Sequence, residues 1–303
     1  MDIQHPRDKV ELREALAALL ERPGVTPAEI DEQIDALIRY TLRRQVSLEH
    51  CLMACDQGRL VGVCLCIDGA GRLSTLFIPT QSRFLVPATA MVSLLEEVAR
   101  QARGRNMQLL QVTVGPDARL EGGVCRQAGF ERLAQMIYMD SDLTKPLRPP
   151  QPIVDVQWLT YDNAVHPLFA RVVQGTYQRS LDCVGLNEVR HIEDILASHK
   201  AAGEFDPRFW LLARVGGEPA GIILLSQLPE RWALEVVYMG VLPVWRGRGC
   251  GVALLLQALQ IARQQALTTL TLSVDATNVP ALKLYERFGF RETARREVWL
   301  RKL

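Results

Sequence analysis

The fold is decided by residues 236–252, which read Val-Val-Tyr-Met-Gly-Val-Leu-Pro-Val-Trp-Arg-Gly-Arg-Gly-Cys-Gly-Val. The apolar run before Pro243 predicts a strand, and the apolar pattern from Val252 onward predicts a helix. Glycines in the loop between them let a ligand approach the backbone, because they carry no Cβ. The unpaired N–H groups and positive dipole end of a helix N-terminus attract anions. The stretch therefore predicts an anion-binding strand–loop–helix unit, with Arg246 and Arg248 adding positive charge.

The glycine spacing separates this loop from the common nucleotide-binding loops. Gly247-x-Gly249-x-Gly251 does not match the G-x-G-x-x-G of dinucleotide-binding folds, and the Gly-Lys-Ser/Thr of a P-loop is missing from the sequence. A plain turn without a ligand remains an alternative. The spacing thus disfavours a nucleotide of these two classes.

A second motif follows one helix and one strand later, at residues 278–290: Asn-Val-Pro-Ala-Leu-Lys-Leu-Tyr-Glu-Arg-Phe-Gly-Phe. Arg246-x-x-Gly249-x-Gly251 resembles the acyl-CoA pyrophosphate loop of the GNAT superfamily of N-acetyltransferases. The second motif resembles the other signature of that superfamily. Together the two cover residues 234–291, and their order and separation also agree with the superfamily.

The resemblance implies a set of cofactor-binding residues for acetyl-CoA. Backbone N–H groups of the loop would hold the pyrophosphate; these belong to Arg246, Gly247, Arg248, Gly249, Cys250, Gly251 and Val252. The exposed backbone of Met239, Gly240 and Val241 would pair with the pantetheine arm as an added strand does, because the neighbouring strand at 270–274 diverges there. Asn278 would contact the CoA arm or cap the following helix. The resemblance implies no metal.

Two residues are candidates for the chemistry. Tyr285 is the candidate general acid, because a phenol can protonate the thiolate that leaves when an amine attacks a thioester; packing in the core beside Phe288 is the alternative. Glu235 is the candidate base. By strand alternation it is expected on the face of Met239 and Val241, and burial there would raise its pKa. A salt-bridged surface Glu is the alternative.

The two halves of the chain resemble each other. Each begins with helical patterns and continues with a strand hairpin, a strand, an apolar helix, a strand, a short helix and a Gly-Phe turn. Residues 125–132 match residues 285–292, and residues 99–101 match residues 262–264 at nearly the same separation. The sequence thus predicts an internal duplication. It predicts two tandem α/β domains of GNAT type, each a mixed central sheet with flanking helices, at 1–145 and 153–303, with a proline-rich linker at 146–152.

The first half lacks the chemistry of the second. Val86, Pro87 and Ala88 stand where the second half has its glycines, and Cys125 stands at the position of Tyr285. Proline removes an N–H, and the larger side chains would block a phosphate. We therefore expect residues 1–145 to be a degenerate, structural copy, as in tandem members of the superfamily. The chain would be a monomer that acts as an internal pseudo-dimer, or a homodimer.

Composition limits the possible partners and compartment. The net charge is +1, from 35 basic and 34 acidic residues, so nothing indicates nucleic acid or an anionic membrane. The polar N-terminus resembles no signal peptide, and the longest apolar helix is too short for a bilayer. Seven scattered cysteines favour a reducing cytoplasm. Cys64 and Cys66 are expected on one sheet face, as core residues rather than metal ligands.

The acceptor is expected near residues 176–183, which follow the first helix of the second half. Asp182 is either a ligand for a cationic amine or a member of a capped loop. The sequence as a whole predicts direct transfer of an acyl group to an amine of a small molecule or peptide, and acetyl is the acyl group that it favours. A CoA-binding regulatory or scaffold module without turnover, and a nucleotide-dependent enzyme, are the alternatives.

Overall fold

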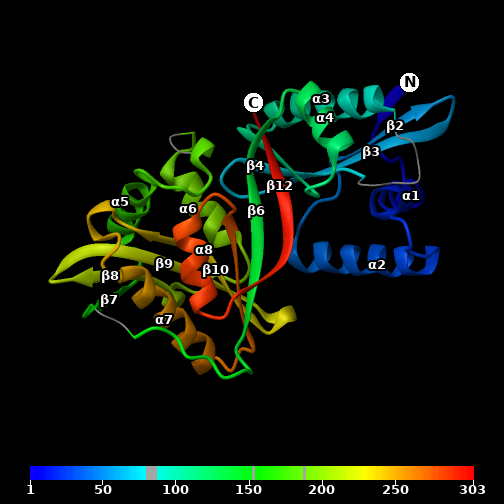
Figure 1. Ribbon diagram of the computed structural model, residues 1–303. Helices are drawn as coiled ribbons and strands as arrows, with labels where there is room; N and C mark the ends of the chain where they lie inside the picture. Colours follow the sequence, from blue (N-terminus) through cyan, green and yellow to red (C-terminus); the bar gives the residue numbers. More distant parts are fainter. Residues whose placement is uncertain (80–86, 152–153, 187–188) are drawn as a thin grey trace. The chain divides into compact units, whose positions relative to one another are not determined.

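The computed structural model describes residues 1–79, 87–151, 154–186 and 189–303 (Figure 1). The chain forms two compact units: unit 1 consists of Met1–Leu133 with Arg296–Leu303, and unit 2 is Ala134–Arg295. Both are mixed α/β units, as the sequence predicted.

Unit 1 is built on a mixed sheet with helices on both faces. Its strands follow the order β1-β2-β3-β4-β5-β12, in which β4 and β5 form the parallel pair. The strands are β1 (Asp2–Gln4), β2 (Cys51–Asp56), β3 (Arg59–Asp68), β4 (Leu73–Phe77), β5 (Leu109–Val114) and β12 (Arg291–Lys302). The helices are α1 (Lys9–Leu20), α2 (Pro27–Arg44), α3 (Ala88–Gly104) and α4 (Arg119–Gln127).

Two apolar layers hold unit 1 together. On one face of the sheet, Leu16 and Ile34 from α1 and α2 pack with strand residues such as Met53. On the other face, α3 and α4 pack over β2 to β5, and this layer includes Cys64, Cys66 and Cys125. Cys64 and Cys66 are therefore core residues on one face, as predicted. Burial raises the pKa of the Cys125 thiol to about 12, so this cysteine is a buried thiol.

Unit 2 repeats this design. Its strands follow the order β6-β11-β10-β9-β8-β7, and β10 and β11 are the parallel pair. The strands are β6 (Glu131–Asp142), β7 (Gln157–Thr160), β8 (Trp210–Val215), β9 (Glu218–Leu228), β10 (Ala233–Val241) and β11 (Thr269–Asp275). The helices are α5 (His166–Tyr177), α6 (Ile192–Ala201), α7 (Cys250–Gln264) and α8 (Val279–Arg287), with 3-10 turns η1 (Val184–Leu186), η2 (Pro207–Phe209), η3 (Pro229–Arg231) and η4 (Pro243–Trp245).

The two faces of the unit 2 sheet differ in their helices. α5 and α6 pack on the face that carries Trp210, Leu224 and Tyr238. α7 and α8 pack on the face that carries Ile223 and Val236. The residues of β9 and β10 that belong to these clusters therefore mark which face of the sheet each helix pair covers.

The element order supports the predicted duplication. Strands and helices of the first half have counterparts in the second half at a nearly constant separation in sequence. By their first residues, the matching elements are Cys51 of β2 and Trp210 of β8, Leu73 of β4 and Ala233 of β10, Leu109 of β5 and Thr269 of β11, Arg119 of α4 and Val279 of α8, and Glu131 of β6 and Arg291 of β12. Gly129 and Gly289, which end the matching helices, have φ values of +75° and +78°, a region that favours glycine. The same backbone plan is therefore used twice.

The division of the chain differs from the predicted boundaries. β6 closes the first half of the sequence, yet its residues 136–142 pair with β11 in unit 2. β12 closes the second half, yet Glu297–Lys302 pairs with β5 in unit 1. Because each unit takes the final strand of the other half, the compact units divide at 133/134 and again at 295/296. The predicted linker begins inside unit 2, where Leu147 packs against the α7–α8 core.

Candidate functional site

The glycine loop opens directly onto the first turn of α7. Gly247 and Gly249 have φ values of +74° and +87°, in the left-handed region where a side chain is strained. Gly249 is the N-cap of α7 and has no side chain to accept hydrogen bonds from the first N–H groups of the helix. The first backbone hydrogen bond of the helix runs from the Ala253 N–H to the Gly249 carbonyl at 3.2 Å. The N–H groups of the preceding turn have no intrahelical acceptor. The helix, which begins at Cys250 and not at Val252, therefore presents donors to an anion.

Gly251 has a packing role. A Cβ at this position would lie 3.0 Å from Cδ2 of Leu284 on α8. Cys250 beside it is 1% exposed, so its side chain points into the core and only its N–H is offered to a ligand. The third glycine thus lets α7 and α8 approach each other at the loop.

The two arginines of the loop behave differently. The Arg246 guanidinium donates to the carbonyl oxygens of Val241 at 3.0 Å, Arg179 at 2.8 Å and Thr176 at 2.8 Å. It therefore ties the C-terminal end of α5 to the end of β10. The side chain is thus held by backbone carbonyls, and the contribution of its charge to the anion site stays a prediction. The guanidinium of Arg248, an exposed residue, lies 5.5 Å from the ring centroid of Trp245.

β10 and β11 separate beside this loop. They pair in parallel only over four positions, from Ala233 with Thr269 to Val236 with Leu272. Beyond them, β10 continues to Val241 and pairs with β9. Within the described part of the chain, the backbone edge of β10 at residues 237–241 has thus lost its β11 partner, at the position where the sequence predicted a splayed strand.

A bulge in β10 changes the expected face of Glu235. The register with β9 shifts between Val236 and Tyr238, so Glu235 lies opposite Ser226 and Tyr238 opposite Leu224, whereas Met239 lies opposite Ile223. One extra residue reverses the alternation of faces. Glu235 therefore shares the α5–α6 face with Tyr238, and the expectation that it shares the face of Met239 and Val241 is wrong. Burial raises the pKa of its carboxyl group.

Tyr285 and Asn278 lie at the two ends of α8. Tyr285 is 6% exposed and its ring packs beside Phe290, with centroids 5.7 Å apart. Burial, and after it the charge of Asp182, raises the pKa of its phenol well above the ordinary value. Asn278 caps the helix by accepting the Ala281 N–H at 3.4 Å, and its side chain also hydrogen-bonds Asp182. The N-cap alternative is thus confirmed for Asn278.

A polar cluster on the α5–α6 face was missed by the sequence analysis. The Tyr238 hydroxyl hydrogen-bonds Oγ1 of Thr176 at 2.6 Å, and the His199 ring stacks on Tyr238 with centroids 5.2 Å apart. Burial, then the charge of Arg190, lowers the pKa of His199 to about 4, so the imidazole is neutral. Its Nε2 is buried without a hydrogen-bond partner among the described residues. No periodicity in α6 singles out His199; only the bulge, invisible in sequence, turns Tyr238 toward it.

The loop after α5 is fixed to the end of β11 by a reciprocal pair of bonds. The Asp275 N–H donates to Oδ1 of Asp182 at 3.0 Å, and the Cys183 N–H donates to Oδ2 of Asp275 at 3.1 Å. Asp275 is 4% exposed, and its Oδ1 accepts the N–H of Thr277 at 2.9 Å. The expected acceptor region is therefore joined to the strand that separates from β10.

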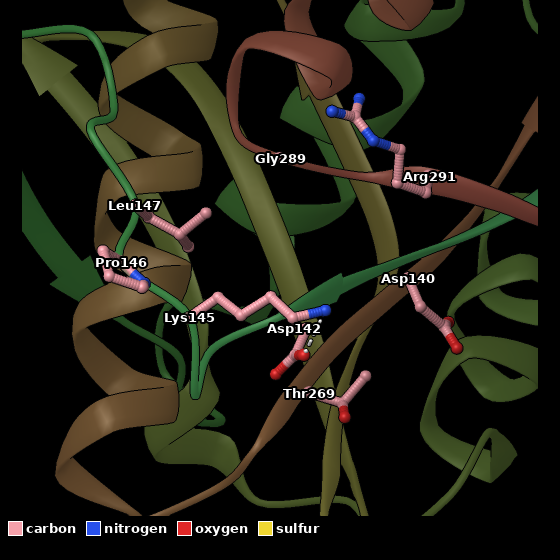
Figure 2. A pocket seen from close by; sticks show the side chains of 8 residues that line it. All are labelled: Asp140, Asp142, Lys145, Pro146, Leu147, Thr269, Gly289 and Arg291. Carbon is pink, nitrogen blue, oxygen red and sulfur yellow. Dashed lines mark ion pairs between the residues drawn. The ribbon is translucent and has the colours of Figure 1, made fainter.

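A cavity of about 470 Å³ lies elsewhere in unit 2. It is lined by residues of β6, the following turn, the start of β11, the turn after α8 and the start of β12 (Figure 2): Asp140, Asp142, Lys145, Pro146, Leu147, Thr269, Gly289 and Arg291. Lys145 and Asp142 form an ion pair at 3.0 Å, drawn dashed in Figure 2. Thr269 begins β11 and Asp275 ends it, so this cavity lies at the opposite end of that strand from the predicted site and includes none of its residues.

Among the described residues, no group of three or more His, Cys, Asp or Glu side chains is arranged to hold a metal ion. In the same part of the chain, no helix has the length and apolarity needed to cross a membrane.

Part of the chain matches a known protein family. Residues 177–290 match the acetyltransferase (GNAT) family. The chain is 32% identical over 194 residues to a mycothiol acetyltransferase of Acidothermus cellulolyticus, a match that covers 55% of this chain and 54% of that protein. It is 40% identical over 95 residues to a mycothiol acetyltransferase of Streptomyces griseus, covering 31% of each chain. The chain thus matches about half, or less, of the length of these relatives.

Solved structures support the fold of the whole chain. A GCN5-related N-acetyltransferase from Sphaerobacter thermophilus superposes with a TM-score of 0.66 at 17% identity, covering 99% of this chain and 95% of that one. A tandem GNAT protein from the clavulanic acid biosynthesis pathway superposes with a TM-score of 0.56 at 15% identity, covering 99% and 98%. At such identities the likeness concerns the fold alone, and it includes the tandem arrangement.

Proposed function

Residues 177–290 match the acetyltransferase (GNAT) family, and on this premise we propose that unit 2 is an acyl-CoA-dependent N-acyltransferase with acetyl-CoA as donor. One observation carries the proposal. The β10 edge at residues 237–241, which β11 leaves after Val236, runs directly into a glycine-capped helix N-terminus at Gly249. A free strand edge followed by an anion site suits a donor with an amide-containing arm and a pyrophosphate.

Donor binding is assigned to backbone groups. The N–H groups from Gly247 to Val252 would hold the pyrophosphate, and Met239, Gly240 and Val241 would pair with the pantetheine arm. The exposed side chain of Arg248 is free to approach the phosphates. Arg246 would contribute indirectly, because its hydrogen bonds to three backbone carbonyls fix the start of the loop. Asn278 would reach the arm from the start of α8.

The proposed reaction is direct transfer. The acceptor nitrogen forms a bond to the thioester carbon, the carbon–sulfur bond breaks, and the thiolate of CoA leaves. Tyr285 would donate a proton to that sulfur, and Glu235 would remove a proton from the nitrogen, through water if the distance requires it. The face reversal at the bulge favours this division of roles, because Glu235 belongs to the side of α5 and α6, where the acceptor is expected.

The acceptor is proposed to be an amine of a small molecule or peptide. Because two relatives are named mycothiol acetyltransferase, the acceptor of those relatives is the first amine to test in a panel. Unit 1 is proposed to serve as a structural copy, because Pro87 precedes α3 and Cys125 replaces the tyrosine. Seven free cysteines are consistent with a reducing cytoplasm.

The test combines binding and turnover. Calorimetric titration with acetyl-CoA is expected to show one site per chain, and a thiol-release assay over a panel of amines is expected to show CoA formation with at least one of them. Tight acetyl-CoA binding without thiol release from any amine would favour a CoA-binding module. Binding of ATP or NAD in place of acetyl-CoA would overturn the assignment.

A further inference from the structure

One aromatic side chain beside the glycine loop is left out of the core. Trp245 ends η4, directly before Arg246, and is half-buried. Leu242 and Val252, on either side of the loop, pack against the apolar clusters of unit 2. Among the described residues, Trp245 belongs to none of the apolar clusters. Because large aromatic rings usually contribute most through burial in a core, core packing does not explain a tryptophan at this position.

The polar groups around this ring are without partners in the described part of the chain. There, no group accepts a hydrogen bond from the indole N–H of Trp245, and no carboxylate forms an ion pair with Arg248. The Arg248 guanidinium instead lies 5.5 Å from the centroid of the ring. This contact restricts the movement of an otherwise exposed side chain, because guanidinium groups stack on aromatic faces. The ring thus holds one positive charge beside the loop.

The two side chains belong to the segment that is assigned to the pyrophosphate of the donor. In the sequence they stand on either side of Gly247, which has φ +74° and no other heavy atom within 4 Å of the place of a Cβ. In CoA, the pyrophosphate joins the pantetheine arm to an adenosine that carries a 3′-phosphate. An aromatic ring suits the purine, because every base has a face that can stack. A guanidinium suits a phosphate, because its N–H groups form charge-assisted hydrogen bonds.

We propose that Trp245 and Arg248 bind the nucleotide end of the donor, with the indole ring in contact with the adenine and the guanidinium on the 3′-phosphate. This proposal rests on the acyl transfer proposed above and names the class of donor that the site selects: a free CoA thioester. An acyl group on the phosphopantetheine of a carrier protein has no adenosine, so it would gain nothing from these two side chains. Trp245 and Arg248 determine donor specificity and take no part in the chemistry.

The test measures the affinity of the full-length chain for three thioesters, by calorimetry or by displacement of acetyl-CoA. They are acetyl-CoA itself, acetyl-dephospho-CoA, which lacks the 3′-phosphate, and S-acetyl-4′-phosphopantetheine, which lacks the adenosine. In Trp245→Ala, affinity for acetyl-CoA is expected to fall about tenfold, because the contact with one base is lost. Affinity for S-acetyl-4′-phosphopantetheine is expected to change by about twofold or less, because that ligand has no base to stack.

Three further variants separate the two contacts from loop structure. Arg248→Ala should lower affinity for acetyl-CoA about tenfold and leave affinity for acetyl-dephospho-CoA nearly unchanged, because only acetyl-CoA has the 3′-phosphate. Trp245→Phe keeps an aromatic face and should recover most of the affinity that Trp245→Ala loses. Trp232, which is 67% exposed and lies at the opposite end of β10 from the loop, supplies the control. Trp232→Ala should leave the affinity for all three ligands unchanged.

Failure of this assignment is distinguishable from failure of the acyl transfer. Equal loss of affinity for acetyl-CoA and S-acetyl-4′-phosphopantetheine in Trp245→Ala would assign the ring to loop structure and overturn the proposal. Unchanged affinity for acetyl-CoA in that variant would overturn it as well. A chain that shows the expected pattern of affinities but releases no thiol with any amine would refute the acyl transfer alone. A wild-type chain that does not bind acetyl-CoA would refute both.

Discussion

The parallel strand pairs of the two units begin alike and end differently. In unit 1, Leu73–Leu76 pairs with Leu109–Val112, and in unit 2, Ala233–Val236 pairs with Thr269–Leu272, which are matching places of the two halves. β4 ends one residue later, at Phe77, whereas β10 continues to Val241. The pairing that builds the fold is the same in both units, and the extension that would hold a donor is present in one.

The helices after these strands show the same contrast. Neither helix has a side-chain cap, but α7 begins after Gly249, which carries no side chain, whereas α3 begins after Pro87, which has no N–H. At equivalent positions of α8 and α4, unit 2 has Tyr285 and unit 1 has Cys125. Core packing is maintained by many residues, so it tolerates such changes; a ligand site depends on a few backbone positions and is lost with them. The predictions below test this contrast.

The largest effect is expected from a side chain at the helix N-cap. Gly249→Val places a β-branched residue at φ +87° in the loop and a side chain where a phosphate would approach. We expect acetyl-CoA affinity to fall by about two orders of magnitude, measured by calorimetry. Unchanged affinity would mean that the pyrophosphate does not bind at this loop.

A matched glycine supplies the control for backbone strain. Gly217, in the β8–β9 turn, has φ +84° and open space around its Cβ position. Gly217→Val should lower the free energy of unfolding by about 1–3 kcal/mol and leave acetyl-CoA affinity unchanged. Loss of binding in both variants would point to general destabilisation.

The next effect concerns the residue that unit 1 has replaced. Tyr285→Phe keeps the ring that packs beside Phe290 and removes the proton donor. We expect kcat to fall by about a hundredfold, while acetyl-CoA affinity and the thermal midpoint stay the same. A thiol-release assay measures kcat. An unchanged kcat would show that Tyr285 is a core residue only.

A smaller effect distinguishes the two arginines of the loop. Arg246→Ala removes three bonds to backbone carbonyls and should lower the free energy of unfolding by about 2 kcal/mol. Arg248→Ala should leave stability unchanged and weaken acetyl-CoA binding in a salt-dependent manner. Denaturant titration and calorimetry at two ionic strengths measure both. A reversed pattern would exchange the roles assigned to the two side chains.

The limits of the sequence prediction follow from the kind of signal that each feature leaves. The helices, the hairpins and the glycine loop were predictable, because hydrophobic periodicity and glycine spacing are local. The exchange of β6 and β12 was not, because pairing residue 297 with residue 114 leaves no local pattern. The predicted face of Glu235 was wrong because one bulge residue reverses the alternation of side chains between the two faces for all later positions of the strand. The hydrogen bonds of Arg246 were likewise not predictable, because the carbonyls of Thr176 and Arg179 that accept them are distant in sequence.

The smallest effect is expected in unit 1, at the residue that aligns with Tyr285. Cys125 is fully buried, and its raised pKa of about 12 leaves almost no thiolate at neutral pH. Cys125→Ala removes one sulfur atom from the core, so it should cost about 1 kcal/mol of unfolding free energy and leave kcat/KM unchanged. A thiol reagent should label Cys125 only after unfolding, as followed by mass spectrometry of the modified peptide. Rapid labelling of the native chain, or loss of turnover in Cys125→Ala at unchanged stability, would assign chemistry to unit 1 and end the contrast between the two units.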